Sequence, residues 1–162
     1  MTNTVSKNVN YIGLNPEKVD GLAQALNDLL SNYQVFYMNV RGYHWNIKGE
    51  KFFELHAKFE ELYSDLQIKI DEIAERVLTL GETPRHSFSA YLKTAEIGAA
   101  EQVSDGYTAV KGILEAFRVL ISKQRDILYQ SDEAQDEGTN ALMSDYIREQ
   151  EKLVWMYAAF LG

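Results

Sequence analysis

The sequence of 162 residues contains no cysteine, which excludes disulfide bonds, thiolate chemistry and thiolate ligands for a metal. Its two prolines, Pro16 and Pro84, fall at the edges of expected helices, and long stretches lack glycine, as is typical of all-helical proteins. Residues 1–10 contain no apolar run of the kind found in signal peptides, and no segment is apolar over the length of a membrane span. We therefore expect a cytoplasmic protein with no membrane attachment.

The sequence also has fewer basic than acidic residues. Lysine and arginine number 16 against 24 aspartates and glutamates, so the formal net charge is −8. A general nucleic-acid binder needs a basic surface that displaces counterions from phosphate groups, and this composition argues against that class. An excess of negative charge suits a protein that attracts cations.

Much of the sequence has the apolar spacing of amphipathic helices. Apolar residues recur at alternating steps of three and four over four long segments, which predicts four amphipathic helices. The predicted helices cover residues 16–46, 52–80, 107–128 and 139–160. On the last of them, the residues expected to face the core are Leu142, Tyr146, Leu153, Met156 and Phe160.

One connection is much longer than the others. Residues 81–102 join the second and third helices, and Ser87 is expected to cap a short helix within this segment. A long connection at this point indicates a crossover rather than a plain up-and-down arrangement. The sequence thus predicts an all-α fold: a four-helix bundle over residues 15–162 with a short extra helix in the crossover, preceded by a flexible tail over residues 1–14.

Five side chains on the first two predicted helices are candidate metal ligands. His44 lies at the end of the first helix, and His56 and Glu60 lie four residues apart near the start of the second. Asp71 and Glu75 form another pair with the same spacing, which places each pair on one helix face. Imidazole and carboxylate ligands together suit iron, manganese or zinc. Taken singly, each of these residues is better explained as a helix cap or a solvated surface group, but the five together at these spacings favour a metal site.

Helix geometry shows that one chain cannot complete a site from these residues. At about 100° per residue, the two pairs of the second helix share an arc of about 100° that flanks its apolar stripe. His56 and Asp71 nevertheless lie roughly 22 Å apart along the axis, whereas a metal ligand lies about 2 Å from its ion. A second, antiparallel copy of the helix, crossing near residues 63–66, would bring the two pairs together, and a two-fold axis would create two equivalent sites.

A di-iron centre inside a single bundle is not expected. Ferritins that hold iron in the bundle core use Glu-x-x-His motifs on inward-facing positions. None of the three histidines in this chain has a glutamate three residues before it.

Two segments resemble the signatures of the Dps family of mini-ferritins, which belongs to the ferritin-like superfamily. The first is His-Trp-Asn-Ile-Lys-Gly at 44–49, followed by Leu-His at 55–56 and by Glu60. The second is Ile-Asp-Glu-Ile-Ala-Glu-Arg at 70–76, followed by Leu-Gly at 80–81 and by Pro84. The resemblance covers nearly the whole chain and implies a ferritin-like bundle that assembles into a shell of twelve subunits.

The same resemblance implies a set of roles for individual residues. His44 and His56 are metal ligands from one chain, and Asp71 and Glu75 are ligands from its two-fold mate. Glu60 occupies a ligand position at which many members of the family have aspartate. The adjacent Trp45 is the candidate catalytic residue, since in the resembling proteins this tryptophan stands by the iron and quenches oxidising equivalents; the alternative is a packing role at a helix end.

An acidic segment near the end of the third helix matches the region where the family has negatively charged three-fold pores. Its candidate pore residues are Asp132, Asp136, Glu137 and Asp145. Converging carboxylates would concentrate cations at an entrance to the shell. The alternative is an acid-rich helix N-terminus, which the helix dipole favours.

The function implied by the resemblance is that of a ferroxidase and iron store. Fe²⁺ is oxidised by hydrogen peroxide, or more slowly by dioxygen, at inter-subunit di-iron sites where Zn²⁺ can substitute, and the ferric mineral is kept in the shell. Two alternatives remain: a DNA-compacting stress protein, and a structural cage whose metal site has decayed. Because residues 1–13 hold one basic side chain, Lys7, we expect no DNA binding at neutral pH.

Overall fold

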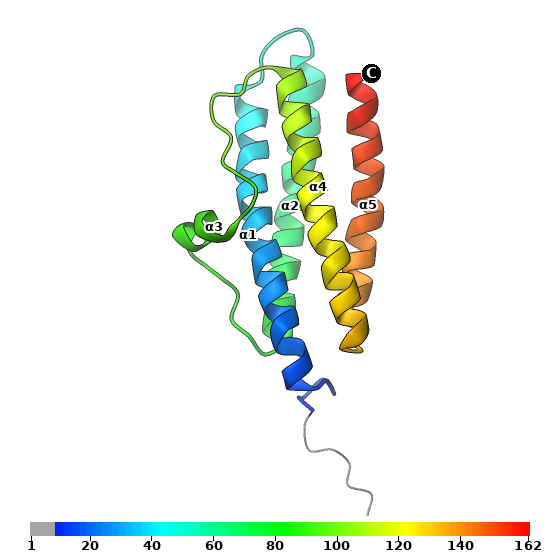
Figure 1. The fold of residues 1–162 in the computed structure, drawn as a ribbon. Helices are drawn as coiled ribbons and strands as arrows, with labels where there is room; N and C mark the ends of the chain where they lie inside the picture. Colours follow the sequence, from blue (N-terminus) through cyan, green and yellow to red (C-terminus); the bar gives the residue numbers. More distant parts are fainter. Residues whose placement is uncertain (1–8) are drawn as a thin grey trace, which may run out of the picture.

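A computed structural model describes residues 9–162, and its elements confirm the all-α prediction (Figure 1). The four long helices run side by side, and the one short helix lies beside them in the crossover. The five helices are α1 (Pro16–Asn46), α2 (Phe52–Thr79), α3 (Phe88–Thr94), α4 (Gly106–Glu133) and α5 (Glu137–Leu161). In the part of the chain that is described, no helix is both long and apolar enough to cross a membrane.

The ends of the helices follow from local side-chain chemistry. The Asn15 side chain accepts a hydrogen bond from the backbone N–H of Glu17, and Pro16 occupies the first helical position of α1, as the sequence predicts. Ser87 caps α3 in the same manner. Gly81 adopts a φ of +94° directly after α2, a conformation that favours glycine and turns the chain into the crossover.

Three buried asparagines of α1 hold the crossover against the bundle. Each of Asn27, Asn32 and Asn39 accepts a hydrogen bond from the main chain of the crossover, within residues 83–85 or 96–100. Asn27 and Asn39 also donate to carbonyl oxygens of the same segments. A carboxamide both donates and accepts, so it can satisfy irregular backbone that forms no helix of its own.

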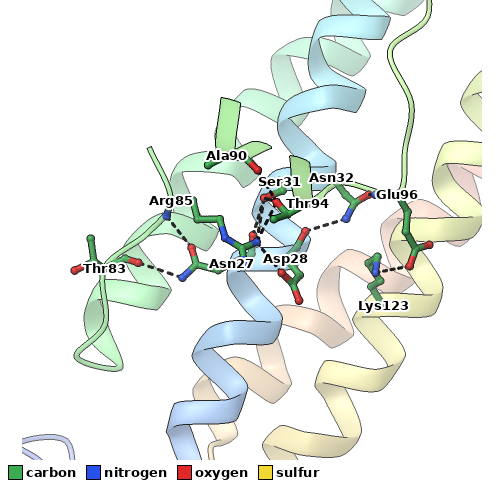
Figure 2. A network of polar contacts seen from close by, with 10 residues as sticks. All are labelled: Asn27, Asp28, Ser31, Asn32, Thr83, Arg85, Ala90, Thr94, Glu96 and Lys123. Carbon is green, nitrogen blue, oxygen red and sulfur yellow. Dashed lines mark hydrogen bonds and ion pairs between the residues drawn. The ribbon is translucent and has the colours of Figure 1, made fainter. Parts of the chain in front are cut away.

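Ionic contacts reinforce the crossover, as Figure 2 shows. Arg85 donates to Asp28 at 2.7 Å and to the Ser31 hydroxyl at 3.2 Å. Thr94, at the end of α3, donates to the same Ser31 hydroxyl. The short helix α3 is therefore fixed beside α1 at both of its ends.

The core of the bundle contains a closed ring of polar side chains. Tyr33 donates to Gln124, Gln124 donates to Gln150, and Gln150 donates back to Tyr33. All three side chains are buried, and burial raises the pKa of the Tyr33 hydroxyl. The ring lets polar residues occupy interior positions without unpaired groups.

The predicted core stripe of α5 is confirmed at four of its five positions. Tyr146 is buried, and Leu142, Leu153 and Phe160 are half-buried and pack against the core, whereas Met156 is exposed. The fully buried residues of α5 are Thr139, Met143, Tyr146, Ile147, Gln150 and Tyr157. Hydropathy does not reveal Thr139 and Gln150 in this set, because they are polar and find their hydrogen-bond partners inside the protein.

Polar side chains also join α2 to α5. The Lys69 ammonium lies 2.8 Å from a carboxylate oxygen of Glu149, and 2.8 Å from one of Asp65. One turn further along α2, Glu72 accepts a hydrogen bond from the Tyr146 hydroxyl, and burial together with this bond raises the pKa of Tyr146. These contacts fix the register of α2, the helix that carries most of the candidate ligands.

The predicted flexible tail, residues 1–14, lies mostly outside the described residues. Residues 10–14 form a hydrogen-bonded turn in which the Asn10 side chain accepts from the N–H groups of Ile12 and Leu14. Leu14 packs against the hydrophobic core. The division of the chain at residue 15 stays a prediction.

Candidate functional site

His44 and His56 lie against each other where α1 ends and α2 begins. Their imidazole rings stack with centroids 3.8 Å apart and planes inclined by 15°. Each Nδ1 lies within hydrogen-bonding distance of the other residue's backbone carbonyl oxygen, at 2.7 Å for His44 and 2.8 Å for His56. The contact is therefore reciprocal, and it ties the two helices together through their backbones.

This reciprocal contact decides which ring nitrogens are available to a metal. A carbonyl oxygen only accepts hydrogen bonds, so each Nδ1 carries the proton and donates it. In the neutral rings of His44 and His56, the lone pair is then on Nε2, the nitrogen that neither hydrogen bond occupies. Fixing the tautomer through a hydrogen bond to the opposite nitrogen is how proteins prepare histidine for metal binding.

Aromatic rings enclose the histidine pair. The Tyr63 and His44 rings form a T-shaped contact with planes inclined by 81° and centroids 5.2 Å apart, and Phe52 stacks on His56 at 5.0 Å. His44 is buried and His56 is half-buried. Packing on both sides restricts the rotation of the rings and so keeps the pair in one arrangement.

Trp45 and Arg41 continue this aromatic layer along α1. The Trp45 side chain is 58% exposed, and the guanidinium carbon of Arg41 lies 5.0 Å from its ring centroid. The same guanidinium lies over the rings of Tyr63 and Tyr37. Arg41 does not stand out in the sequence, because a lone arginine on the flank of a helix is usually a surface residue.

The three predicted carboxylate ligands are exposed on α2. Glu60 is one helical turn beyond His56, and Asp71 and Glu75 lie further along the same helix. Among residues 9–162, no three histidine, aspartate or glutamate side chains gather closely enough to hold a metal ion. The structure therefore brings His44 and His56 together and leaves the two acids of the second pair apart from them, as the axial distance of roughly 22 Å requires.

Asp136 is not placed as a pore residue would be. Its side chain is buried and forms an ion pair with Arg76 at 2.6 Å. It also caps α5 by accepting a hydrogen bond from the backbone N–H of Thr139. The prediction that Asp136 lines an entrance is corrected for this reason: its charge is compensated inside the chain, and it serves the helix N-terminus.

The other predicted pore acids are exposed. Asp132 lies in the last turn of α4, and Glu137 begins α5. Asp145 is exposed as well, but it pairs with Arg148 at 3.0 Å. Asp132 and Glu137 thus remain available to other subunits or to cations, and their role in an entrance stays a prediction.

Comparison with known proteins gives a consistent result. The ferritin-like domain model matches residues 23–162. The DNA protection during starvation protein of Porphyromonas gingivalis is 40% identical over 156 residues, which cover 96% of this chain and 98% of the relative.

Solved structures agree with the sequence comparison. The crystal structure of the Dps protein from Vibrio cholerae O1, described as a member of the ferritin-like diiron-carboxylate superfamily, superposes with a TM-score of 0.94. It is 59% identical, over 99% of this chain and 100% of that one. A Dps protein from Bacillus brevis superposes with a TM-score of 0.87 at 35% identity, covering 90% of this chain and 98% of its own.

Proposed function

Since this chain belongs to the Dps family of the ferritin-like superfamily, we propose that it is a cytoplasmic mini-ferritin that oxidises ferrous iron and stores the ferric product. The observation that carries this proposal is the reciprocal pair of His44 and His56. A pair of packed imidazoles, one buried and one half-buried, with both Nε2 lone pairs kept free is a prepared half of a metal site. A purely structural cage would not need this arrangement.

The other half of the site comes from a second subunit. His44, His56 and Glu60 of one chain meet Asp71 and Glu75 of a chain related by a two-fold axis, so each pair of chains forms two equivalent sites. The axial separation of the two groups on α2, roughly 22 Å, supports this division, because no single ion can span it. Twelve subunits then form the shell.

An apolar surface beside the ligand face supports the same pairing. Its exposed side chains come from α1, α2 and α3 and are Met38, Ile68, Phe88 and Leu92. A hollow of about 650 Å³ between α1 and α3 shares Gln34 and Tyr37 with the surface around Asp71. An exposed apolar surface of this kind is typical of a protein contact, and a second copy would bring its ligands within reach.

Ferrous iron is the substrate of the proposed reaction. Two Fe²⁺ ions each give one electron to one molecule of hydrogen peroxide, whose O–O bond breaks, and the ferric ions hydrolyse to an oxyhydroxide and release protons. The carboxylates of Glu60, Asp71 and Glu75 favour the harder Fe³⁺, and the neutral imidazoles retain Fe²⁺. Zn²⁺ would occupy the same ligands, but it cannot be oxidised and would inhibit the reaction.

Trp45 is proposed to supply an electron when only one Fe²⁺ is present to meet a molecule of peroxide. Its position beside His44, in contact with Arg41, supports this role. Asp132 and Glu137, which are exposed at the junction of α4 and α5, are proposed to attract Fe²⁺ to the shell.

The experiment that tests this function is anaerobic loading with Fe²⁺, followed by peroxide and optical measurement of Fe³⁺ formation. We expect oxidation of two Fe²⁺ per peroxide, with little hydroxyl radical released. The matched control is the double variant His44→Ala, His56→Ala, which should oxidise iron no faster than buffer. Equal rates for the natural protein and for buffer would refute the ferroxidase assignment.

A further inference from the structure

Arg41 lies in an unusual environment on the ligand side of α1. Its guanidinium carbon is 4.6 Å from the ring centroid of Tyr63, 5.0 Å from that of Trp45 and 5.6 Å from that of Tyr37. Its Nη1 also donates a hydrogen bond of 2.7 Å to the Tyr37 hydroxyl. None of the ion pairs formed among residues 9–162 includes Arg41.

These contacts explain what this arginine does in the chain. A guanidinium is planar and weakly hydrated, so it stacks on aromatic faces better than an ammonium does. Each such contact is attractive, because the ring presents a negative face to the cation. Arg41 thus binds three rings from two helices, and the bond to Tyr37 fixes the rotation of its planar group.

Trp45 depends on this contact more than the other rings do. Tyr37 and Tyr63 also pack edge to face against each other, with centroids 6.1 Å apart. In the described part of the chain, Arg41 is the one aromatic or cationic group that stacks on the Trp45 ring. A side chain as exposed as Trp45 would otherwise exchange among rotamers.

The cluster reaches the metal-binding histidines through one of its members. Tyr63 packs against His44 in a T-shaped contact, at a centroid distance of 5.2 Å. Arg41 lies on Tyr63 and on Trp45 together, so it links the exposed indole to the ring that packs on the ligand.

We propose that Arg41 is a positioning residue of the site: its guanidinium holds the Trp45 indole in a fixed stack with Tyr63 beside His44. We call this contact of Arg41 with Trp45 and Tyr63 the clamp, and its purpose rests on the proposed ferroxidase function. The clamp itself is a property of the protein without metal, and it can be measured without iron.

The test uses tryptophan fluorescence of the assembled, metal-free protein. The sequence has two tryptophans, so Trp155→Phe leaves Trp45 as the only one, and excitation at the red edge of the indole absorption avoids the ten tyrosines. In this background, Arg41→Gln should shift the Trp45 equilibrium about two- to fivefold toward unstacked rotamers, the change expected for losing one exposed cation–π contact, and so raise the acrylamide quenching constant of Trp45. Arg41→Lys should fall between the two, since it keeps the charge but loses the planar stack.

The matched control is Arg118→Gln, which removes the same charge from an exposed arginine of α4 that pairs with Glu115. Quenching of Trp45 that is unchanged in Arg41→Gln would overturn the proposal. An equal increase in Arg118→Gln would also overturn it, because net charge would then be the cause. If Arg41→Gln does not assemble, Arg41→Lys decides the question, and quenching equal to that of the parent would refute the clamp.

Failure of this proposal is distinguishable from failure of the proposed function. A natural protein that does not oxidise iron, yet shows increased quenching in Arg41→Gln, would refute the ferroxidase and keep the clamp. A natural protein that oxidises iron, with Trp45 quenching unchanged in Arg41→Gln, would support the ferroxidase and refute the role of Arg41.

Discussion

Asp136 and Arg76 form a buried ion pair that joins the start of α5 to α2. The Arg76 guanidinium lies 2.6 Å from a carboxylate oxygen of Asp136, and its Nε donates to the Thr139 hydroxyl at 2.9 Å. Gly138 comes so close that an added Cβ would lie 2.6 Å from the guanidinium. The pair therefore depends on a glycine beside it as well as on two opposite charges.

Removing the carboxylate of this pair should destabilise the fold. We expect Asp136→Ala to lower the free energy of unfolding by about 3 kcal/mol, at the lower end for a broken buried pair because Arg76 keeps some access to water. Urea denaturation would measure the change. The control Asp132→Ala, on the exposed end of α4, should shift stability by less than about 0.5 kcal/mol. Equal effects of the two variants would contradict the structural role of Asp136.

The shared site makes a prediction about mixed shells. Take one variant with His44→Ala and His56→Ala, and another with Asp71→Ala and Glu75→Ala. Each alone lacks half of every site and should be inactive, but a two-fold pair containing one chain of each kind has one intact site. Co-assembled shells should therefore regain part of the peroxide-dependent Fe²⁺ oxidation.

Verification of mixing is the necessary control for this experiment, and native mass spectrometry of shells with one isotope-labelled variant would supply it. Lasting inactivity in verified mixed shells would show that the ligands do not come from two chains. The ferroxidase chemistry could then still be correct, with another set of ligands.

The apolar surface on α3 should govern assembly. Phe88 is 80% exposed in the single chain, and burying such a side chain in a contact contributes about 1.5–3 kcal/mol. We expect Phe88→Asp to shift the protein toward smaller species in sedimentation velocity, because the contact loses this burial and gains a charge. Phe88→Leu keeps an apolar side chain and should assemble normally. Shells of Phe88→Asp as stable as those of the parent would rule out this surface as the two-fold contact.

The charge of the chain makes a prediction about DNA. With a formal net charge of −8 per subunit, the protein should repel a polyanion, since each phosphate contact needs a cation. We expect no retardation of duplex DNA in a gel-shift titration at neutral pH and physiological salt. Divalent cations must be omitted, because they bridge two polyanions. Retardation of the DNA under these conditions would support the alternative of a DNA-compacting protein.

The sequence predicts the helices well wherever apolar spacing and capping residues agree. Asn15 and Pro16 start α1 as expected, and Ser87 starts α3. These signals are local, since each cap depends on backbone groups two or three residues away. The same holds for the axial distance between His56 and Asp71, which follows from helix rise alone.

Other features depend on contacts between distant residues and could not be predicted in this way. In the sequence, Asn27 looks like an ordinary polar residue, because its partner, the Thr83 carbonyl oxygen in the crossover, lies 56 residues further along the chain. Gln150 faces the core because Tyr33 and Gln124 meet it there. The stacked arrangement of His44 on His56 likewise requires the backbones of two helices to meet, which spacing does not reveal.

The ring formed by Tyr33, Gln124 and Gln150 has a consequence for where chemistry can occur. All three side chains are neutral, and their hydrogen bonds close on one another, so an entering cation would lose its hydration and find no charge to replace it. The bundle core around this ring would therefore exclude iron. If the ligands are divided between two subunits as proposed, a newly made chain would carry no complete reactive centre until it meets a second one.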